Sequence, residues 1–242
     1  MRQHNFFLMF LKIVFFSAIL VSTSSARAEL KVVTTIKPLH SLIANVMDGV
    51  GEPALIIEGS TSPHSFTLKP SHAKLLEEAD IIFWIGEGIE TFMERPLESI
   101  VKNAEVVEFM EIESINKLKF REESIFEDHD DHDDHSDHDD HDDHEDHDDH
   151  SDHDDHGHAH GEFDPHIWLD PMNAKEMVHE IAHELGNLDP ANKDKYEANA
   201  KTTIQVLDQL VNDIDKGINK DAKFVVFHDA YQYFEERFGV RA

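Results

Sequence analysis

Histidine is concentrated in one stretch of this chain, where it alternates with acidic residues. From His129 to His156 a histidine falls at every third position, separated almost entirely by aspartate. Imidazole and carboxylate groups are ligands that borderline divalent cations accept. We predict that the tract 128–160 is a low-affinity metal collector, with an inert, solubilising charge run as the alternative. Its twelve histidines are His129, His132, His135, His138, His141, His144, His147, His150, His153, His156, His158 and His160.

The spacing of this tract also bears on its structure. A period of three matches neither the 3.6 residues of a helical turn nor the two-residue repeat of a strand. The tract contains no apolar side chain larger than Ala159. Because such a segment cannot bury a core, we predict a disordered, solvated loop over residues 128–160.

Three other histidines occur in settings that look ordered. His64, His166 and His228 each stand at or just beyond a strand-like segment, in loops with Pro, Gly or Asp neighbours. In open α/β sheets, ligands bind at the carboxyl ends of the strands. Three neutral imidazoles on rigid elements would make a tetrahedral site with one open position, which suits zinc better than magnesium or manganese. Taken singly, each histidine is better explained by a structural role, so it is their shared placement that favours a metal site.

The run His179-Glu180-Ile-Ala-His183 matches a metalloprotease signature. On a helix the two histidines would lie one turn apart and could hold zinc, while Glu180 polarises a bound water. The apolar residues of the same segment form an ordinary core stripe, which leaves the histidines toward its flank or the solvent. An exported zinc metalloprotease is therefore an alternative function.

The first half of the chain alternates between strand-like and helical patterns. Helices are predicted to begin at Pro38, at Ser71 and near Phe92. The continuous apolar strands between them predict an α/β fold with a parallel, doubly wound sheet. The predicted strands cover residues 30–36, 54–57, 80–85 and 106–109.

The second half is predicted to be mostly helical. Asn173 should cap a helix that ends near Leu188. One rigid helix of about 28 residues, hence roughly 40 Å long, is predicted over 191–218. A buried strand over 224–227 would then deliver His228, followed by a helix over 230–238. Because one strand and one helix cannot bury their own apolar face, we expect further sequence beyond Ala242.

Charge limits the class of partner. The formal charge is −30, but the tract 128–160 holds 17 of the 51 acidic residues, and without them 34 acids face 21 bases, a charge of −13. The remainder is only moderately acidic. This argues against nucleic acid or an anionic membrane surface as a partner.

The N-terminus predicts export. Arg2 and Lys12 flank an apolar run that leads into Ser-Ser-Ala-Arg-Ala28, which predicts a signal peptide cleaved after Ala28. The apolar run is too short to span a membrane comfortably. The chain has no cysteine, so neither a disulfide nor a lipid-attached cysteine is possible. We therefore expect a soluble protein of the periplasm.

Several motifs in combination resemble the zinc-binding solute receptors of bacterial ABC importers, the ZnuA type. The resemblance covers essentially all of residues 30–240. It implies two Rossmann-like α/β lobes with parallel sheets, joined by one long rigid helix and with the metal in the cleft between them. The second lobe would then be incomplete in this chain. The motifs are Ser62-Pro63-His64, Lys69-Pro70-Ser71, the run from Ala79 to Gly86, Glu90-Thr-Phe92, the run from His166 to Pro171 and the run from Phe227 to Phe234.

The resemblance also implies a function and a ligand set. The family's histidine ligands fall on His64, His166 and His228. The chain would be a monomeric receptor and not an enzyme. It would carry Zn²⁺ to an ABC permease of the inner membrane with its cytoplasmic ATPase. Manganese-binding relatives have a glutamate at the last position, so His228 favours zinc, and a manganese receptor is an alternative.

The fourth ligand is left open by the resemblance. Some members have a glutamate before the first histidine, where this chain has Pro63. Others take an acidic ligand from late in the second lobe, so the fourth position here falls to water or to such a residue. The predicted domains are a signal peptide (1–28), a first lobe (29–188), a linking helix (189–219) and the start of a second lobe (220–242).

Overall fold

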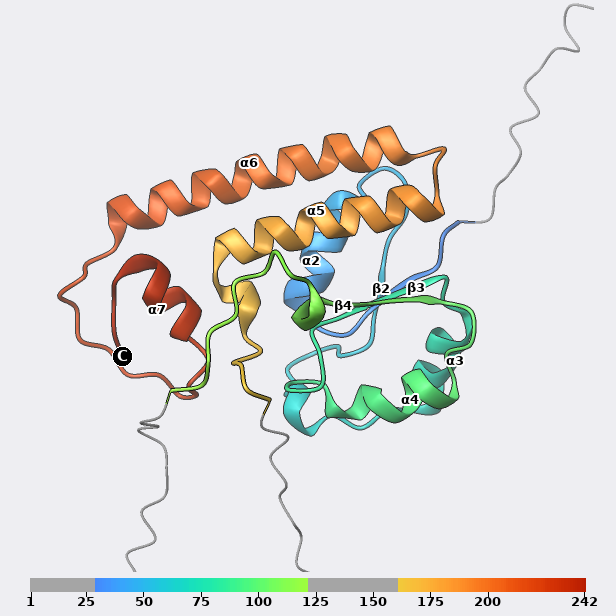
Figure 1. The fold of residues 1–242 in the computed structure, drawn as a ribbon, viewed down its shortest axis with the longest axis horizontal. Coiled ribbons are helices and arrows are strands. Elements are labelled where there is room, and N and C mark those ends of the chain that lie inside the picture. The colour runs from blue at the N-terminus through green and yellow to red at the C-terminus, as the bar shows by residue number, and fades with distance from the viewer. Residues whose placement is uncertain (1–28, 122–160) are drawn as a thin grey trace, which may run out of the picture.

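The fold is built on a small parallel sheet. The structure, a computed structural model, describes residues 29–121 and 161–242 (Figure 1). Four parallel strands lie in the order β2-β1-β3-β4, which confirms the predicted α/β class. Both the predicted signal peptide, 1–28, and the tract 128–160 lie outside the described residues. The strands are β1 (Val32–Thr34), β2 (Ala54–Leu55), β3 (Ile81–Trp84) and β4 (Glu105–Glu108).

The central strands are apolar on both faces because helices cover both sides of the sheet. All four residues of β3 are buried, as the uninterrupted Ile-Ile-Phe-Trp sequence predicts. Helices α2, α5 and α6 lie on one side, and α3 and α4 lie on the other (Figure 1). Their bounds are α2 (Lys37–Val46), α3 (Pro70–Glu78), α4 (Glu94–Ser99), α5 (Pro171–Leu188), α6 (Lys193–Gly217) and α7 (Gln232–Phe238).

The start of α5 differs from the prediction. The cap is Asp170, whose carboxylate accepts a hydrogen bond from the Met172 amide at 2.9 Å. The prediction that Asn173 caps this helix is wrong. A carboxylate followed by proline at the first helical position already makes a favourable N-terminus. Asn173 instead lies inside the helix and forms paired hydrogen bonds with the backbone of Asn116, both at 2.9 Å.

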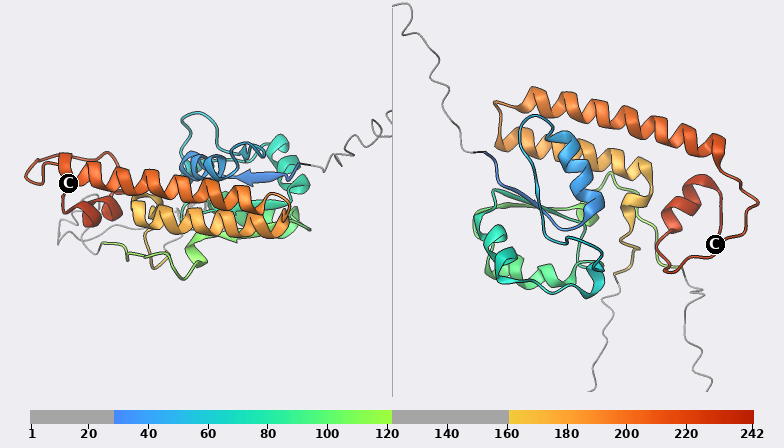
Figure 2. Two further views of the ribbon diagram at one scale, coloured as in Figure 1. Left: turned by 90° about the horizontal axis from the view of Figure 1, so that it is seen from above. Right: turned by 180° about the vertical axis from the view of Figure 1, so that it is seen from behind.

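Helix α6 is a single helix of 25 residues, close to the long helix predicted from the sequence. It runs alongside α5 in every view (Figures 1 and 2). In its first half, Tyr196, Ala200 and Thr203 are buried. Further along, Val206 and Leu210 are 64% and 46% exposed. Among the helices in the described parts of the chain, none has the length and hydropathy to cross a bilayer.

The segment before His228 is not a strand. Residues 224–227 have no regular secondary structure, and Val225 and Phe227 are 95% and 103% exposed. A strand needs a neighbour that pairs with its backbone, and none of the four described strands pairs with this segment. The predicted buried strand is therefore wrong for this structure.

Candidate metal centre

Three histidines from distant parts of the chain converge. One ring nitrogen from each of His64, His166 and His228 lies within 4.8 Å of the other two. The Nε2 atoms of His166 and His228 are 3.3 Å apart. Two nitrogens bound at 2.0–2.1 Å to one tetrahedral ion would lie about 3.3 Å apart. The nitrogens of His166 and His228 therefore have the spacing of two ligands of one zinc ion, and that of His64 lies within 4.8 Å of both.

Each histidine comes from a different element. His64 lies in a 3₁₀ turn (η1, Pro63–Ser65) in the loop that follows β2 and is exposed. His166 immediately precedes the 3₁₀ turn η4 (Ile167–Leu169) and is only 6% exposed. His228 lies in the loop before α7 and is exposed. One buried and two accessible imidazoles give a site that an ion can enter from solvent.

The orientation of His166 is fixed by Asp164, which is itself buried. Oδ1 of Asp164 accepts a hydrogen bond from the His166 backbone amide at 2.9 Å and lies 2.7 Å from Nδ1 of the ring. An ionised carboxylate can only accept, so Nδ1 carries the proton and Nε2 presents its lone pair to the other two histidines. Sequence reasoning missed Asp164. The sequence does carry an indication of its role. An aspartate side chain can accept a hydrogen bond from the backbone amide two residues later, and Asp164 lies two residues before His166.

The surroundings favour the neutral imidazoles that metals bind. Burial lowers the pKa of His64, and the neighbouring rings of His166 and His228 lower it further. Burial and His166 likewise lower the pKa of His228, although Asp164 and Asp229 oppose this. Ligand imidazoles must be deprotonated at the coordinating nitrogen, so these shifts favour metal binding.

The metalloprotease signature is not part of this cluster. His179 and His183 are exposed on α5, whereas the apolar residues between and around them are buried. Within residues 29–121 and 161–242, the group with metal-ligand spacing is the three-histidine cluster, and it contains no carboxylate. The histidines of the tract 128–160 lie outside the described residues.

Comparison with known proteins identifies the family of the chain. The family model described as "ZnuA: Zinc-uptake complex component A periplasmic" matches residues 32–242. The chain belongs to the ZnuA family. This confirms the resemblance drawn from the sequence motifs.

Relatives of this ZnuA-family chain include proteins named for high-affinity zinc uptake. The high-affinity zinc uptake system protein ZnuA of Brucella abortus (strain 2308) is 49% identical over 218 residues, which cover 87% of this chain and 65% of that protein. The protein of the same name from Yersinia pestis is 33% identical over 226 residues, covering 93% of this chain and 68% of that one. The chain thus spans 65% of the length of the Brucella relative.

A solved structure has the same fold. The Zn(II)-bound AdcA of Streptococcus pneumoniae aligns with a TM-score of 0.65 at 22% identity, over 88% of this chain and 38% of that one. At this identity the likeness concerns the fold alone.

Proposed function

We propose that this chain is the zinc-binding receptor of a bacterial ABC importer, which captures Zn²⁺ in the periplasm and delivers it to an inner-membrane permease driven by a cytoplasmic ATPase. The observation that carries the proposal is the convergence of His64, His166 and His228 within 4.8 Å of one another. Membership of the ZnuA family and the names of its relatives support it.

The donor set supports zinc as the cargo. Three imidazole nitrogens would bind one ion and leave a fourth tetrahedral position for water or a further ligand. Manganese prefers oxygen ligands. The cluster offers no carboxylate in the parts of the chain that the structure describes.

The remaining assignments belong to the same proposal. The signal peptide would cover 1–28 and the first lobe 29–188, with a linking helix over 189–219 and a second lobe beginning at 220. The receptor would act as a monomer and not as an enzyme. The tract 128–160 would gather zinc at low affinity.

The test is zinc affinity in three single variants of the full chain, His64→Ala, His166→Ala and His228→Ala. Each should weaken the tightest site by more than the roughly 10- to 100-fold expected for loss of an outer-shell partner. Competition with chromogenic chelators measures this affinity, and visible absorption of the Co²⁺ form reports tetrahedral coordination.

His179→Ala is the matched control, because this histidine is exposed on α5 and lies outside the cluster. Retention of the tight site in any of the three cluster variants would overturn the assignment. Tighter binding of Mn²⁺ than of Zn²⁺ would instead indicate a manganese receptor.

A further inference from the structure

His228 receives little support from its own segment. It lies at the end of a stretch without regular secondary structure, directly after the fully exposed Phe227. Its carbonyl accepts a hydrogen bond from the Ala230 amide at 2.8 Å, which forms only a local turn. Nevertheless its Nε2 lies 3.3 Å from that of His166. Something beyond the loop must hold it there.

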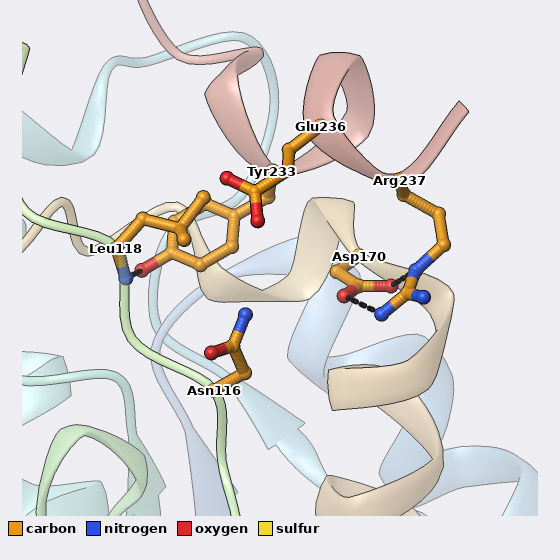
Figure 3. Close-up of a pocket in the computed structure, with 6 residues that line it drawn as sticks. All are labelled: Asn116, Leu118, Asp170, Tyr233, Glu236 and Arg237. Atoms are coloured by element: carbon orange, nitrogen blue, oxygen red, sulfur yellow. Dashed lines mark hydrogen bonds and ion pairs between the residues drawn. The ribbon is translucent and has the colours of Figure 1, made fainter. Parts of the chain in front are cut away.

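Helix α7, which begins four residues after His228, is anchored by a buried tyrosine. Tyr233 is 1% exposed. Its hydroxyl donates to the carbonyl of Asp164 at 2.6 Å and accepts from the Leu118 amide at 3.0 Å. Figure 3 shows the ring reaching from α7 to Leu118.

A second anchor lies one turn further along α7. The guanidinium of Arg237 donates from Nε to Oδ1 of Asp170 at 2.7 Å and from Nη2 to Oδ2 at 2.6 Å (Figure 3). Asp170 is 2% exposed. Bidentate pairing of arginine with a buried carboxylate fixes geometry as well as contributing energy.

The two anchors bracket His166. Asp164 and Asp170 are the two ends of one short segment, and His166 lies between them. Asp164 takes part twice, because its side chain orients His166 while its carbonyl accepts the Tyr233 hydroxyl. The docking of α7 therefore fixes the position of His228 relative to His166.

The contact between α7 and its neighbours also contains polar groups. A small cavity of about 80 Å³ remains between α7 and the 116–118 segment, lined mainly by polar groups of Asn116, Asp170, Glu236 and Arg237 (Figure 3). Arg121 adds a bridge, since it pairs with Glu235 and lies 3.7 Å from the carboxylate of Asp229, next to His228. These polar contacts surround the buried ring of Tyr233, and Phe238 on the same helix is also only 1% exposed.

We propose that Tyr233 and Arg237 are positioning residues for zinc, which dock α7 on the Asp164–Asp170 segment and so hold His228 at the ion. This rests on the proposed three-histidine site. Because such coupling is reciprocal, docking of α7 strengthens zinc binding and zinc strengthens the docking of α7.

The test compares Tyr233→Phe and Arg237→Gln with matched controls in the full chain. Each should weaken the tight zinc site by about three- to tenfold, the change that loss of one or two hydrogen bonds produces. Tyr231→Phe and Arg241→Gln should bind zinc as the parent does, because both residues are exposed. Chelator competition gives the affinities, and circular dichroism confirms that each variant is folded.

Hydrogen exchange supplies a readout that a merely structural role would not change. Zinc should slow amide exchange across residues 228–238 in the parent, and this slowing should be lost in His228→Ala. In zinc-free Tyr233→Phe and Arg237→Gln, α7 should exchange faster than in the parent. Should Tyr233→Phe fail to fold, Arg237→Gln still decides, because its side chain is partly exposed.

The outcomes separate this inference from the proposed function. If the cluster variants lose the tight site but Tyr233→Phe and Arg237→Gln bind like the parent, and zinc leaves α7 exchange unchanged, the docking proposal is overturned and the receptor proposal stands. If His166→Ala retains the tight site, the receptor site itself is wrong.

Discussion

Oδ1 of Asp164 lies 2.7 Å from Nδ1 of His166, and both side chains are buried. The same oxygen accepts the backbone amide of His166, so the ring is held by its own chain and by the carboxylate together. A metal-binding histidine oriented in this way is more basic at its other nitrogen and loses less freedom on binding. Asp164 thus orients His166 so that its Nε2 faces His228.

Replacement of Asp164 should weaken zinc binding in a graded way. Asp164→Asn keeps an acceptor oxygen but loses the charge, so we expect about a tenfold loss of affinity, whereas Asp164→Ala loses both and should cost about 100-fold. Chelator competition on the full chain measures both. Asp221→Asn, at an exposed position, is the control. Equal affinity of the alanine variant and the parent would contradict this role.

Deletion of residues 128–160 should lower the number of zinc ions bound per chain and spare one tight site. The ends of the deletion can be joined, because Lys119 and Phe163 form an antiparallel bridge and Lys119 pairs with Glu162. The three cluster histidines all lie outside the deleted segment. Equilibrium dialysis gives the stoichiometry and chelator competition the tight affinity.

A second variant separates the histidines of the tract from its charge. Replacement of its twelve histidines by asparagine keeps length and charge, and it should lower the stoichiometry in the same direction as the deletion. Loss of the tight site in either variant would mean that the three-histidine assignment is wrong.

The Glu180→Gln variant should leave zinc binding unchanged and should not alter any hydrolysis of peptide substrates. The neighbouring His179 and His183 are exposed on α5, and no third ligand joins them in the described chain. A fluorogenic peptide assay with added zinc checks this. Zinc-dependent cleavage that Glu180→Gln abolishes would restore the metalloprotease alternative.

Glu90 should make the metal-free fold less stable as pH rises through the acid range. It is fully buried, and its Oε2 accepts from the Ile85 and Gly86 amides at 2.8 and 3.0 Å. Burial raises its pKa from 4.5 to about 7. Below about pH 4.5 both states are protonated. Between pH 4.5 and 7 the Glu90 carboxyl is ionised in the unfolded state but still protonated in the folded state. The free energy of unfolding therefore falls by about 3 kcal/mol across this range, at 1.36 kcal/mol per pKa unit. Above pH 7 the loss is constant.

Glu90→Gln should remove this loss. The glutamine oxygen can still accept hydrogen bonds from the two backbone amides. The glutamine nitrogen can donate to the Thr35 hydroxyl, which in the parent donates to Glu90. Urea unfolding between pH 4.5 and 8 should show parent and variant diverging across the window. Glu98→Gln, at an exposed position, should follow the parent. Parallel profiles of parent and Glu90→Gln would refute the assignment.

The features that the sequence predicted correctly are those that depend on the pattern of neighbouring residues. The apolar run Ile81–Trp84 is buried on both faces, as a central parallel strand requires. The long apolar repeat became α6. The three histidines were chosen because each stands in a similar loop, and the structure places them side by side. Their role as zinc ligands stays a proposal.

The features that sequence missed depend on partners far along the chain. The apolar run at 224–227 has the composition of a strand, but a strand exists only where another strand pairs with it. The anchoring of α7 joins Tyr233 to Asp164, 69 residues earlier, and no local pattern marks that pair. Asp164 itself reads as an ordinary turn residue before proline.

The chain reaches His228 through a connection without regular secondary structure. The stretch 218–231, which lacks helix and strand, connects α6 to α7 (Figures 1 and 2). When α7 leaves its dock, His228 remains tethered to the rest of the molecule. A short flexible tether keeps such a ligand at an effective concentration of about millimolar. Under the docking proposal, release of the ion would need only a local displacement of α7 and His228, and the sheet and the α5–α6 pair would stay in place.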